Sequence, residues 1–459
     1  MPGSIEHAST STVAARLAEW VVDVNFDDIP EDVVETACRL VLDQLGLQIR
    51  GSTLPNVAPV RAVAERLAGA PDCTVTGAAW RTTAPHAAYV NGTMGHSCEF
   101  DDAHMRAAHA TSTVISTAIA FGEQHGSTGR DIVTAIVAGQ QVMSLLGAVA
   151  MPGMQDAGWH ISKVLGVYGA AATAGRLLGL DAAQLCNAFG IAGSDAGGTM
   201  EYDRSGGEVK RLHAGSAARL GSEAALLAQA GYTGPATIFE GHRGLFAVFA
   251  HETSVARLEE GWGKWQIRDT MFRLFPAVCT IHSPIAAVAR LVDDHDIDWR
   301  DVRSIRVGLD ELSFGHGASI VHPHDAISAQ FSLAYSIALR LVRRSNRVAD
   351  YFDRSSYTDP GIVAVADLVA PYLMPVPEGD PIFSSDVTIT LLDGTEYHHY
   401  ERGFPGHTVN PASDEQVLAK FRSNVEDILD PQQADALIAL AADLPKLEGL
   451  KPLTALLSG

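Results

Sequence analysis

The sequence predicts a mainly α-helical protein that carries a smaller α+β part. From residue 11 to residue 231, segments with apolar residues at helical spacing follow one another and are rich in Ala, Gly, Val and Leu. After Trp265 the pattern changes, because two segments alternate polar and apolar residues with a period of two, which is typical of strands. The 459 residues also exceed what one hydrophobic core usually supports, so we expect two domains.

The first part of the chain is expected to be a dense helical bundle. Small residues let helices approach closely, which leaves little room for strands. The longest apolar run, 132–151, is interrupted by Gln140, Gln141 and glycines, so a buried helix explains it better than a membrane span. The expected helices cover residues 11–22, 31–50, 57–67, 112–122, 129–150, 164–178, 181–190 and 217–230.

The later part is expected to form the α+β unit and then return to helix. Asp393-Gly394 between two alternating segments is typical of a hairpin turn. Ser413 followed by Gln416 has the pattern of a capping box, which starts a helix. We expect the C-terminal helices to pack back on the first bundle. The expected strands are 302–309, 386–392 and 396–400, and the expected helices are 281–295, 326–341, 413–425 and 432–442.

Charge and cysteine usage restrict the class of partner. The net charge of −21 argues against nucleic acid and against an anionic membrane surface, because a polyanion repels both at long range. An anionic substrate therefore needs a local positive site. The five cysteines are scattered and form no C-x-x-C pair, which indicates a reduced compartment and no thiolate metal site. Residues 1–10 lack the regions of a signal peptide, so a cytoplasmic protein is expected.

The stretch from Gly197 to Gly231 is the first candidate for such a positive site. Its first half is predicted to be a glycine-rich loop, and its second half a helix that ends before Gly231. Lys210, Arg211 and His213 lie at the junction, where the start of a helix favours an anion such as a carboxylate. The alternative is a solvated basic turn.

The segment 96–109 is the densest polar cluster of the first half and contains Glu99, Asp101 and Asp102. For Asp101 and Asp102 the alternative to a site is a helix N-cap with a structural ion pair. A metal site at His104 and His109 is not favoured, because five residues place two side chains on different faces of a helix. No metal is expected.

Two further histidines lie in suggestive surroundings. His160 follows a glycine-rich segment, and Arg273 and His282 flank a proline turn that leads into a helix, which is a second plausible grip for a carboxylate. For both histidines the alternative is a structural role. Fingerprints for a phosphate loop, a dinucleotide and a nucleophile elbow are missing, so no cofactor is expected. Together these residues suit proton abstraction beside a carboxylate of a small, anionic polycarboxylic acid.

Four segments together resemble the MmgE/PrpD family. GGTMEY at 197–202 and GGEVKRLHAG at 206–215 carry the strongest part of the resemblance, which continues to Glu240-Gly241. The other segments are 96–109, 158–174 and 274–282. The similarity runs over essentially the whole chain, so the sequence is identified as a member of this family.

The resemblance implies a fold, an assembly and a chemistry. It implies a large all-helical domain built from both chain ends, residues 1–268 and 404–459, and a smaller α+β lid domain, residues 269–403. The active site is then expected between them, in a homodimer. Members include 2-methylcitrate dehydratase, cis-aconitate decarboxylase and an iminodisuccinate epimerase, which act on small polycarboxylates without a metal or organic cofactor.

The resemblance also assigns residues to roles. Glu99, His109, His160 and Lys210 match catalytic positions, with His160 or His109 as the proton carrier and Lys210 as carboxylate anchor or proton donor. The residues assigned to substrate binding are Asp102, His213, Arg273 and His282. Four departures weaken the transfer of decarboxylase activity. Ala103 stands where the decarboxylase has Thr, and Glu99 is a longer acid than its Asp. Gln141 and Leu145 occupy positions where relatives often carry Glu and Arg.

The hypotheses about function fall into three groups. The first is a lyase, most like a 2-methylcitrate-type dehydratase, which removes water after proton abstraction beside a carboxylate. The alternatives are a cis-aconitate-type decarboxylase and an isomerase, such as an epimerase of an iminodisuccinate-like dicarboxylate. The third is a non-catalytic member of the fold, against which the retained Lys210, His160 and His109 argue.

Overall fold

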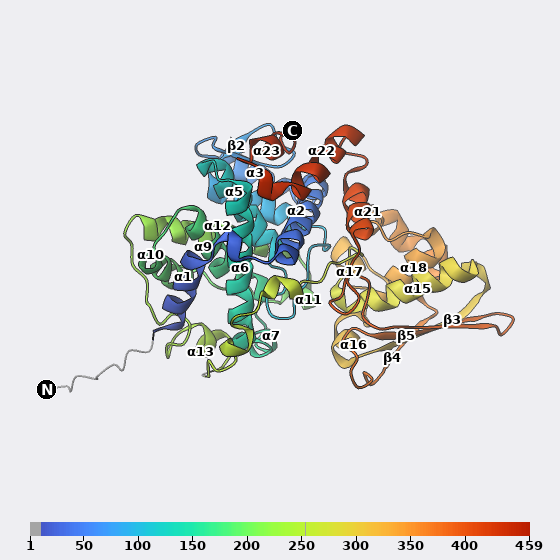
Figure 1. Cartoon of the computed structure of the whole chain (residues 1–459). Helices are drawn as coiled ribbons and strands as arrows, with labels where there is room; N and C mark the ends of the chain where they lie inside the picture. The colour runs from blue at the N-terminus through green and yellow to red at the C-terminus, as the bar shows by residue number, and fades with distance from the viewer. Residues whose placement is uncertain (1–10, 253) are drawn as a thin grey trace.

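The computed structural model of the chain describes residues 11–252 and 254–459, and it is mainly helical as the sequence predicts (Figure 1). Residues 1–10, on which the expectation about a signal peptide rests, lie outside the described residues. The helices of the first part are α1 (Val13–Asp23), α2 (Glu31–Ser52), α3 (Ala58–Arg66), α4 (Ala84–His96), α5 (Thr111–His125), α6 (Gly129–Ala150), α7 (Gly153–Asp156), α8 (Ile161–Val164), α9 (Gly166–Leu177), α10 (Ala182–Ala192), α11 (Tyr202–Ser205), α12 (Val209–Gln229), α13 (Leu245–Phe249) and α14 (Leu258–Gly261).

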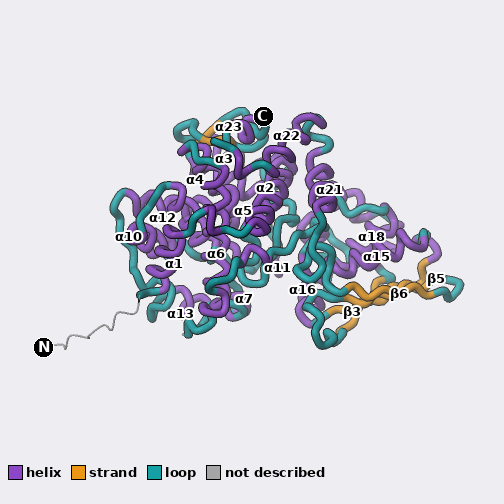
Figure 2. The backbone as a smooth tube through the Cα atoms, viewed as in Figure 1, coloured by secondary structure: helices purple, strands orange, loops and turns teal. Residues whose placement is uncertain are grey.

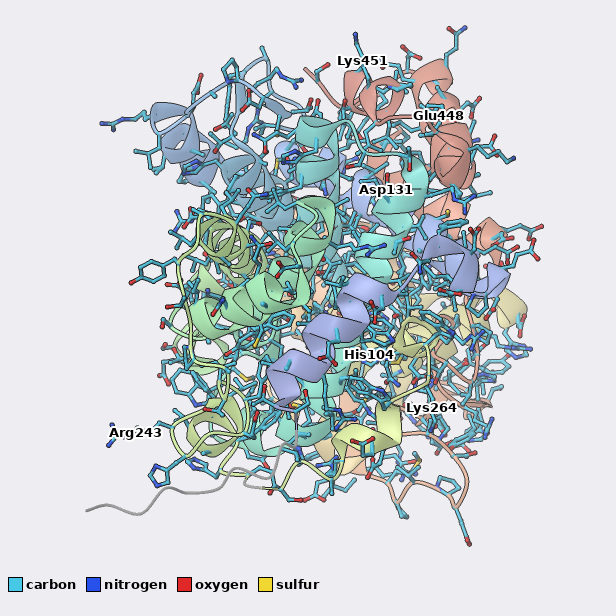
Figure 3. The ribbon with its side chains drawn as sticks, turned by 60° about the vertical axis from the view of Figure 1, so that its left-hand side comes forward. His104, Asp131, Arg243, Lys264, Glu448 and Lys451 are labelled. Atoms are coloured by element: carbon cyan, nitrogen blue, oxygen red, sulfur yellow. The ribbon has the colours of Figure 1, made fainter. Side chains whose placement is uncertain are left out.

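Helix α6 confirms the prediction of a buried apolar helix. It is long and apolar enough to cross a membrane, but its most apolar window is fully buried inside the fold. A capping box at Thr128 and Asp131 starts it, and Figure 3 shows Asp131 near the C-terminal residues Glu448 and Lys451. There the amide of Gly129 donates to the carbonyl of Leu447 at 2.8 Å. The last residues of the chain therefore cover the start of α6.

Close helix packing explains the small residues of this part. A Cβ on Gly215 of α12 would overlap the carbonyl of Tyr89 on α4, and one on Gly221 would overlap the carbonyl of Val167 on α9. Only glycine lets these backbones approach so closely. Strands are few here, but a two-residue pair that the sequence analysis missed, β1 (Cys73–Thr74) with β2 (Arg81–Thr82), is present.

The predicted start of α12 at residue 217 is wrong. The helix begins at Val209, so Lys210, Arg211 and His213 lie in its first two turns and not ahead of it. All three side chains are buried, which reverses the usual polar-outside pattern from which a helix is recognised. These side chains can be buried because their polar groups bind partners from other segments of the fold.

The α+β part contains a four-stranded sheet at one end of the molecule, with α15 and α18 beside it (Figure 2). The expected strands are confirmed as β3 (Val302–Leu309), β5 (Ser385–Leu391) and β6 (Glu396–Glu401), joined in the order β4-β3-β5-β6. Strand β4 (Val369–Leu373) was not expected; it pairs in parallel with β3 and contains Pro371, which an edge strand tolerates.

The helix predicted over 326–341 is two helices. Phe331 ends the first, and the side chain of Ser332 accepts from the amide of Tyr335 to start the second. The helices of this part are α15 (His282–His295), α16 (Glu311–Gly317), α17 (Ala326–Gln330), α18 (Leu333–Arg343), α19 (Val348–Phe352) and α20 (Pro360–Ala366). Short 3-10 helices cover Phe26–Asp28, Gln266–Asp269, Cys279–Ile281, Trp299–Asp301, Arg354–Thr358 and Leu444–Lys446.

The chain ends with α21 (Asp414–Val425), α22 (Pro431–Ala442) and α23 (Lys451–Ala455), and the capping box predicted at Ser413 and Gln416 is present. Phe421 of α21 lies against Gly46 of α2, where a Cβ would come within 2.9 Å of its ring. The buried apolar residues of these helices join those of 13–272 in one cluster, together with Val348. Residues 277–389 supply a second cluster.

Candidate active site

A cavity of about 160 Å³ lies where segments of the first part meet residues 271–280, α16 and Phe331. Ligand pockets commonly measure about 300–1,000 Å³, so this one suits a small molecule. It adjoins a larger space of about 400 Å³ and shares Tyr202, His316 and Phe331 with it. Figure 1 shows α11 facing α16 and α17 at this junction.

An ion-pair cluster forms one wall of the cavity. The Lys210 ammonium donates to both carboxylate oxygens of Glu99 at 2.5 Å. The Arg273 guanidinium donates to Glu99 Oε1 at 2.8 Å and also pairs with the carboxylate of Asp101. These four side chains are at most 7% exposed. Burial raises the pKa of Glu99, but the charges of Lys210 and Arg273 outweigh burial and hold that pKa well below its usual range.

The backbone at Glu99 is held in an uncommon conformation. Its φ of 53° lies in the left-handed region, which residues with a Cβ rarely adopt. Such strain persists when the surrounding structure fixes it, and it gathers at functional sites. Here the turn after α4 aims the carboxylate at Lys210 and Arg273.

Two histidines on the same cavity have one ring nitrogen engaged. The Nδ1 of His109 donates to the carbonyl of Asp102 at 2.5 Å, so its Nε2 carries the lone pair. The Nδ1 of His160 lies 2.8 Å from Nδ1 of His213, which leaves Nε2 for a ligand. Burial, together with the charge of Arg273, lowers the pKa of His109 to about 3. Burial and the neighbouring His213 lower the pKa of His160 well below its usual value.

The structure brings five of the eight predicted site residues to one cavity: Glu99, His109, His160, Lys210 and Arg273. The other three, Asp102, His213 and His282, are not among the residues that line it. His213 lies behind His160, to which it is hydrogen-bonded. The Nε2 of His282 donates to the carbonyl of Ala277 at 3.0 Å, and the ring is fully buried.

Asp102 has the structural role that the sequence left as the alternative. Its carboxylate accepts from the amides of Ala110 and Thr111 at 3.1 Å and from the Thr111 hydroxyl at 2.5 Å. These groups lie at the start of α5, so Asp102 caps that helix. Asp101 likewise takes part in a buried ion pair.

Several residues of the site were missed by the sequence analysis. His96 is fully buried, its Nδ1 lies 2.7 Å from Asp101 Oδ2, and its ring centroid is 5.3 Å from that of His109. Tyr202, Cys279, Thr280 and His316 line the cavity as well. No spacing rule links His96 to Asp101, because the chain leaves the helix between them. Only the three-dimensional structure identifies this contact.

The sequence analysis grouped Arg211 with Lys210 as a candidate for anion binding. Arg211 does not line the cavity and instead connects segments of the chain. Its guanidinium donates to Gln330 at 3.0 Å, to Glu208 at 2.6 Å and to the carbonyl of Ser97. His104 does line the cavity and donates from Nε2 to the carbonyl of Gln266 at 3.0 Å. Among the side chains that the structure describes, three or more of His, Cys, Asp or Glu nowhere gather as a metal site would require.

Comparisons with known proteins give matches to one family over nearly the whole chain. The family model for the MmgE/PrpD N-terminal domain matches residues 15–258, and that for the MmgE/PrpD C-terminal domain matches residues 275–446. A cis-aconitate decarboxylase of Aspergillus terreus is 27% identical, covering 99% of this chain and 98% of the relative. The human cis-aconitate decarboxylase is 26% identical, and the match covers 98% of this chain and 95% of the relative. The 2-methylcitrate dehydratase of Cupriavidus necator is 22% identical, and the match covers 91% of this chain and 90% of the relative.

Proposed function

The chain belongs to the MmgE/PrpD family, and on that premise we propose that it is a lyase that acts on a small polycarboxylate, most like a 2-methylcitrate-type dehydratase. The observation that carries the proposal is the fixed tautomer of His109. Its Nε2 lone pair lies on a cavity that also contains Lys210 and Arg273. A base beside buried cations is what proton abstraction next to a carboxylate requires.

In the proposed reaction, a substrate carboxylate binds the remaining N–H of Lys210. His109 Nε2 takes the proton from the adjacent carbon, and the electron pair forms the carbon–carbon double bond. The hydroxide leaves from the next carbon as water, with a proton from the imidazolium form of His160. His160 ends the step neutral, and the proton gained by His109 is released to solvent. The hydrogen bond from His213 lets His160 change which nitrogen carries its proton, because either Nδ1 can donate to the other. Lys210 and Arg273 stabilise the negative charge that builds on the carboxylate.

A decarboxylase is the second candidate, and the cavity supports it as well. Apolar side chains also line it, among them Met151, Met200, Met271, Val278 and Phe383. Apolar side chains beside a carboxylate desolvate it, which favours its loss as carbon dioxide. His109 or His160 then returns a proton to the carbanion. Relatives named cis-aconitate decarboxylase, at 26–27% identity, agree with this candidate.

The products decide between these reactions. Purified protein is incubated with citrate, 2-methylcitrate, cis-aconitate and iminodisuccinate, and products are followed by NMR. A conjugated alkene with all carboxylates retained supports the dehydratase, and release of carbon dioxide supports the decarboxylase. Exchange of one carbon-bound hydrogen for deuterium without elimination indicates an epimerase instead. No reaction and no binding of any of the four contradicts the proposal and leaves a non-catalytic protein.

Family membership also supports proposals about the domains, the assembly and the cofactor requirement. Residues 269–403 form the lid, a division supported by the separate cluster of buried apolar residues over 277–389. The protein works as a homodimer, so light scattering should give twice its 48.6 kDa. No metal or organic cofactor takes part, and activity should therefore survive dialysis against a chelator.

A further inference from the structure

A further pocket lies where α21 meets the end of α18 and the start of α19 (Figure 1). Its volume is about 300 Å³, which is within the range of pockets for small molecules. The residues that line it are all different from those that line the cavity of the candidate active site. The pocket is therefore a separate place in the fold, to which the proposed reaction assigns no role.

This pocket is positively charged in an acidic chain. The segment RLVRRSNR, residues 340–347, contains four arginines in eight residues, although the net charge of the chain is −21. Arg340, Arg344, Arg347 and Lys420 line the pocket. Asp and Glu are absent from those of its lining residues that the structure describes. This distribution of charge favours an anion as the occupant.

Arg340 is a half-buried cation without a counter-ion among the described residues. Its guanidinium donates from Nε to the side-chain oxygen of Asn346 at 3.0 Å and from Nη1 to the carbonyl of Arg344 at 3.2 Å, and both acceptors are neutral. Burial lowers the pKa of Arg340, and the more distant Asp293 offsets this effect only in part. Because a charge removed from water is unfavourable without an opposite charge, Arg340 is suited to bind an anion in the pocket.

Two of the other cations are held only by exposed ion pairs. Arg347 pairs with Glu426 at 2.8 Å, and these side chains are 62% and 51% exposed. Arg344 pairs with Asp296 at 3.0 Å, and these side chains are 40% and 97% exposed. Exposed pairs of this kind contribute about 0–1 kcal/mol, so an anion in the pocket competes with Glu426 and Asp296 at little cost.

Lys420 connects the pocket with the candidate active site. Its ammonium is bound to Asp43 at 2.7 Å and to the carbonyl of Phe100 at 2.6 Å. Phe100 lines the pocket as well, and it lies between Glu99 and Asp101 in the chain. An occupant of the pocket is therefore next to the segment that carries Glu99, without sharing the cavity of that residue.

We propose that this pocket binds the phosphate group of a small soluble molecule. Arg340 and Arg347 offer donors from the connection between α18 and α19, and Gln416 and Ser423 offer an amide and a hydroxyl from α21. Donors from different directions suit the three oxygens of a phosphate better than the two oxygens of a planar carboxylate. The net charge of −21 argues against nucleic acid and an anionic membrane as the source of the phosphate.

Calorimetry with inorganic phosphate and the full-length protein, at constant ionic strength, tests the proposal. We expect saturable binding at one site per chain. Arg347→Gln changes a side chain that is 62% exposed, so the fold should tolerate it. This variant should weaken phosphate binding about tenfold, which is the effect of losing one charge-assisted hydrogen bond. Arg340→Gln should weaken phosphate binding at least as much.

Arg290→Gln is the matched control. Arg290 is 64% exposed and pairs with Asp294, which is 58% exposed, so the variant removes the same charge from a similar pair that lies outside the pocket. It should leave the phosphate dissociation constant unchanged. Malonate, whose two carboxylates are planar, is the comparison ligand, and Arg347→Gln should affect its binding less than that of phosphate.

Three results would overturn the inference. The first is the absence of saturable phosphate binding. The second is a phosphate dissociation constant that Arg340→Gln and Arg347→Gln both leave unchanged, because phosphate would then bind elsewhere. The third is malonate binding that is as tight as phosphate binding and equally weakened by Arg347→Gln, which would make the pocket a carboxylate site. These titrations measure no turnover, so their failure leaves the lyase proposal standing.

Discussion

Lys210 and Glu99 form a two-point ion pair, 2.5 Å to each oxygen, that joins the first turn of α12 to the strained turn after α4. The two residues are 111 positions apart in the chain. Burial lowers the pKa of Lys210, and Glu99 partly offsets this effect. Lys210 is thus a cation whose position and charge depend on one carboxylate, which makes the pair the first target for mutation.

Lys210→Ala should abolish most activity and destabilise the fold. Loss of a positioned cation in an active site lowers turnover by about 10²- to 10³-fold. Breaking a buried pair costs about 3–5 kcal/mol, and since Arg273 still binds Glu99, we expect the lower end. Turnover of the best substrate and denaturant unfolding measure the two effects.

A double variant separates the two effects. In Glu99→Gln with Lys210→Met no charge of the pair is left unpaired, so the free energy of unfolding should recover by about half or more of the loss. Turnover should stay low, because the cation is still missing. Recovery of activity along with stability would mean that Lys210 acts only in folding.

His109→Gln should lower kcat by about 10²- to 10⁴-fold with little change in ligand binding, because it removes the proposed base.

His213→Leu tests a second residue, which does not line the cavity. If His213 sets the tautomer of His160, its loss should lower kcat and shift the pH profile, whereas His213→Asn, which retains a polar group near Nδ1, should recover part of the activity. Equal activity of the Leu and Asn variants would rule out this relay.

Elements with regular patterns were predictable from the sequence. Strand β3 and helix α6 have the predicted bounds, because an alternating or helical pattern continues to each end and is followed by a turn or a cap. Strand β4 was missed because VAPYL is short and contains a proline. The start of α12 was missed because its first turns carry buried charged residues, and no local pattern distinguishes a buried lysine from an exposed one.

The candidate site was predictable only as far as residue identity goes. Glu99, His109, His160, Lys210 and Arg273 were named, and they do line one cavity. The sequence did not show which of these charged side chains form ion pairs with one another. The cluster was expected to be positively charged, but its cations Lys210 and Arg273 are paired with Glu99, and these contacts join segments more than 100 residues apart.

Asp102→Ala should reduce stability and leave substrate affinity unchanged. The side chain accepts three hydrogen bonds at the start of α5, and the loss of such a cap costs about 1–2 kcal/mol. A substrate-binding role, which the sequence predicted, would instead raise KM at constant stability. Unfolding by denaturant and the KM of the best substrate distinguish the two roles.

Acidification should destabilise the protein below about pH 6.5. The pKa of His104 falls from 6.5 to about 4, mainly through burial, and that of His109 falls to about 3. Between pH 6.5 and 4 the unfolded chain therefore binds protons that the folded chain does not, so stability decreases as the pH is lowered. Asp102 acts in the opposite direction, because burial raises its pKa from 3.8 to about 7 and the folded chain then binds the extra proton. Burial also raises the pKa of Asp43, which acts in the same direction as Asp102. Burial lowers the pKa of His213 to about 4 and that of His282 to about 3, and the four histidines together outweigh the two carboxyl groups.

His104→Gln isolates one of these groups. Each buried histidine contributes up to about 1.4 kcal/mol per pH unit to the slope of stability against pH within its window. In the folded protein Nδ1 of His104 accepts from the amides of Arg106 and Ala107, at 3.0 and 3.1 Å, so a proton on Nδ1 would break both hydrogen bonds. The variant should be less stable at pH 7 and yet show a shallower slope between pH 6 and 4.5, measured by denaturant unfolding. An unchanged slope would mean that His104 does not titrate with folding.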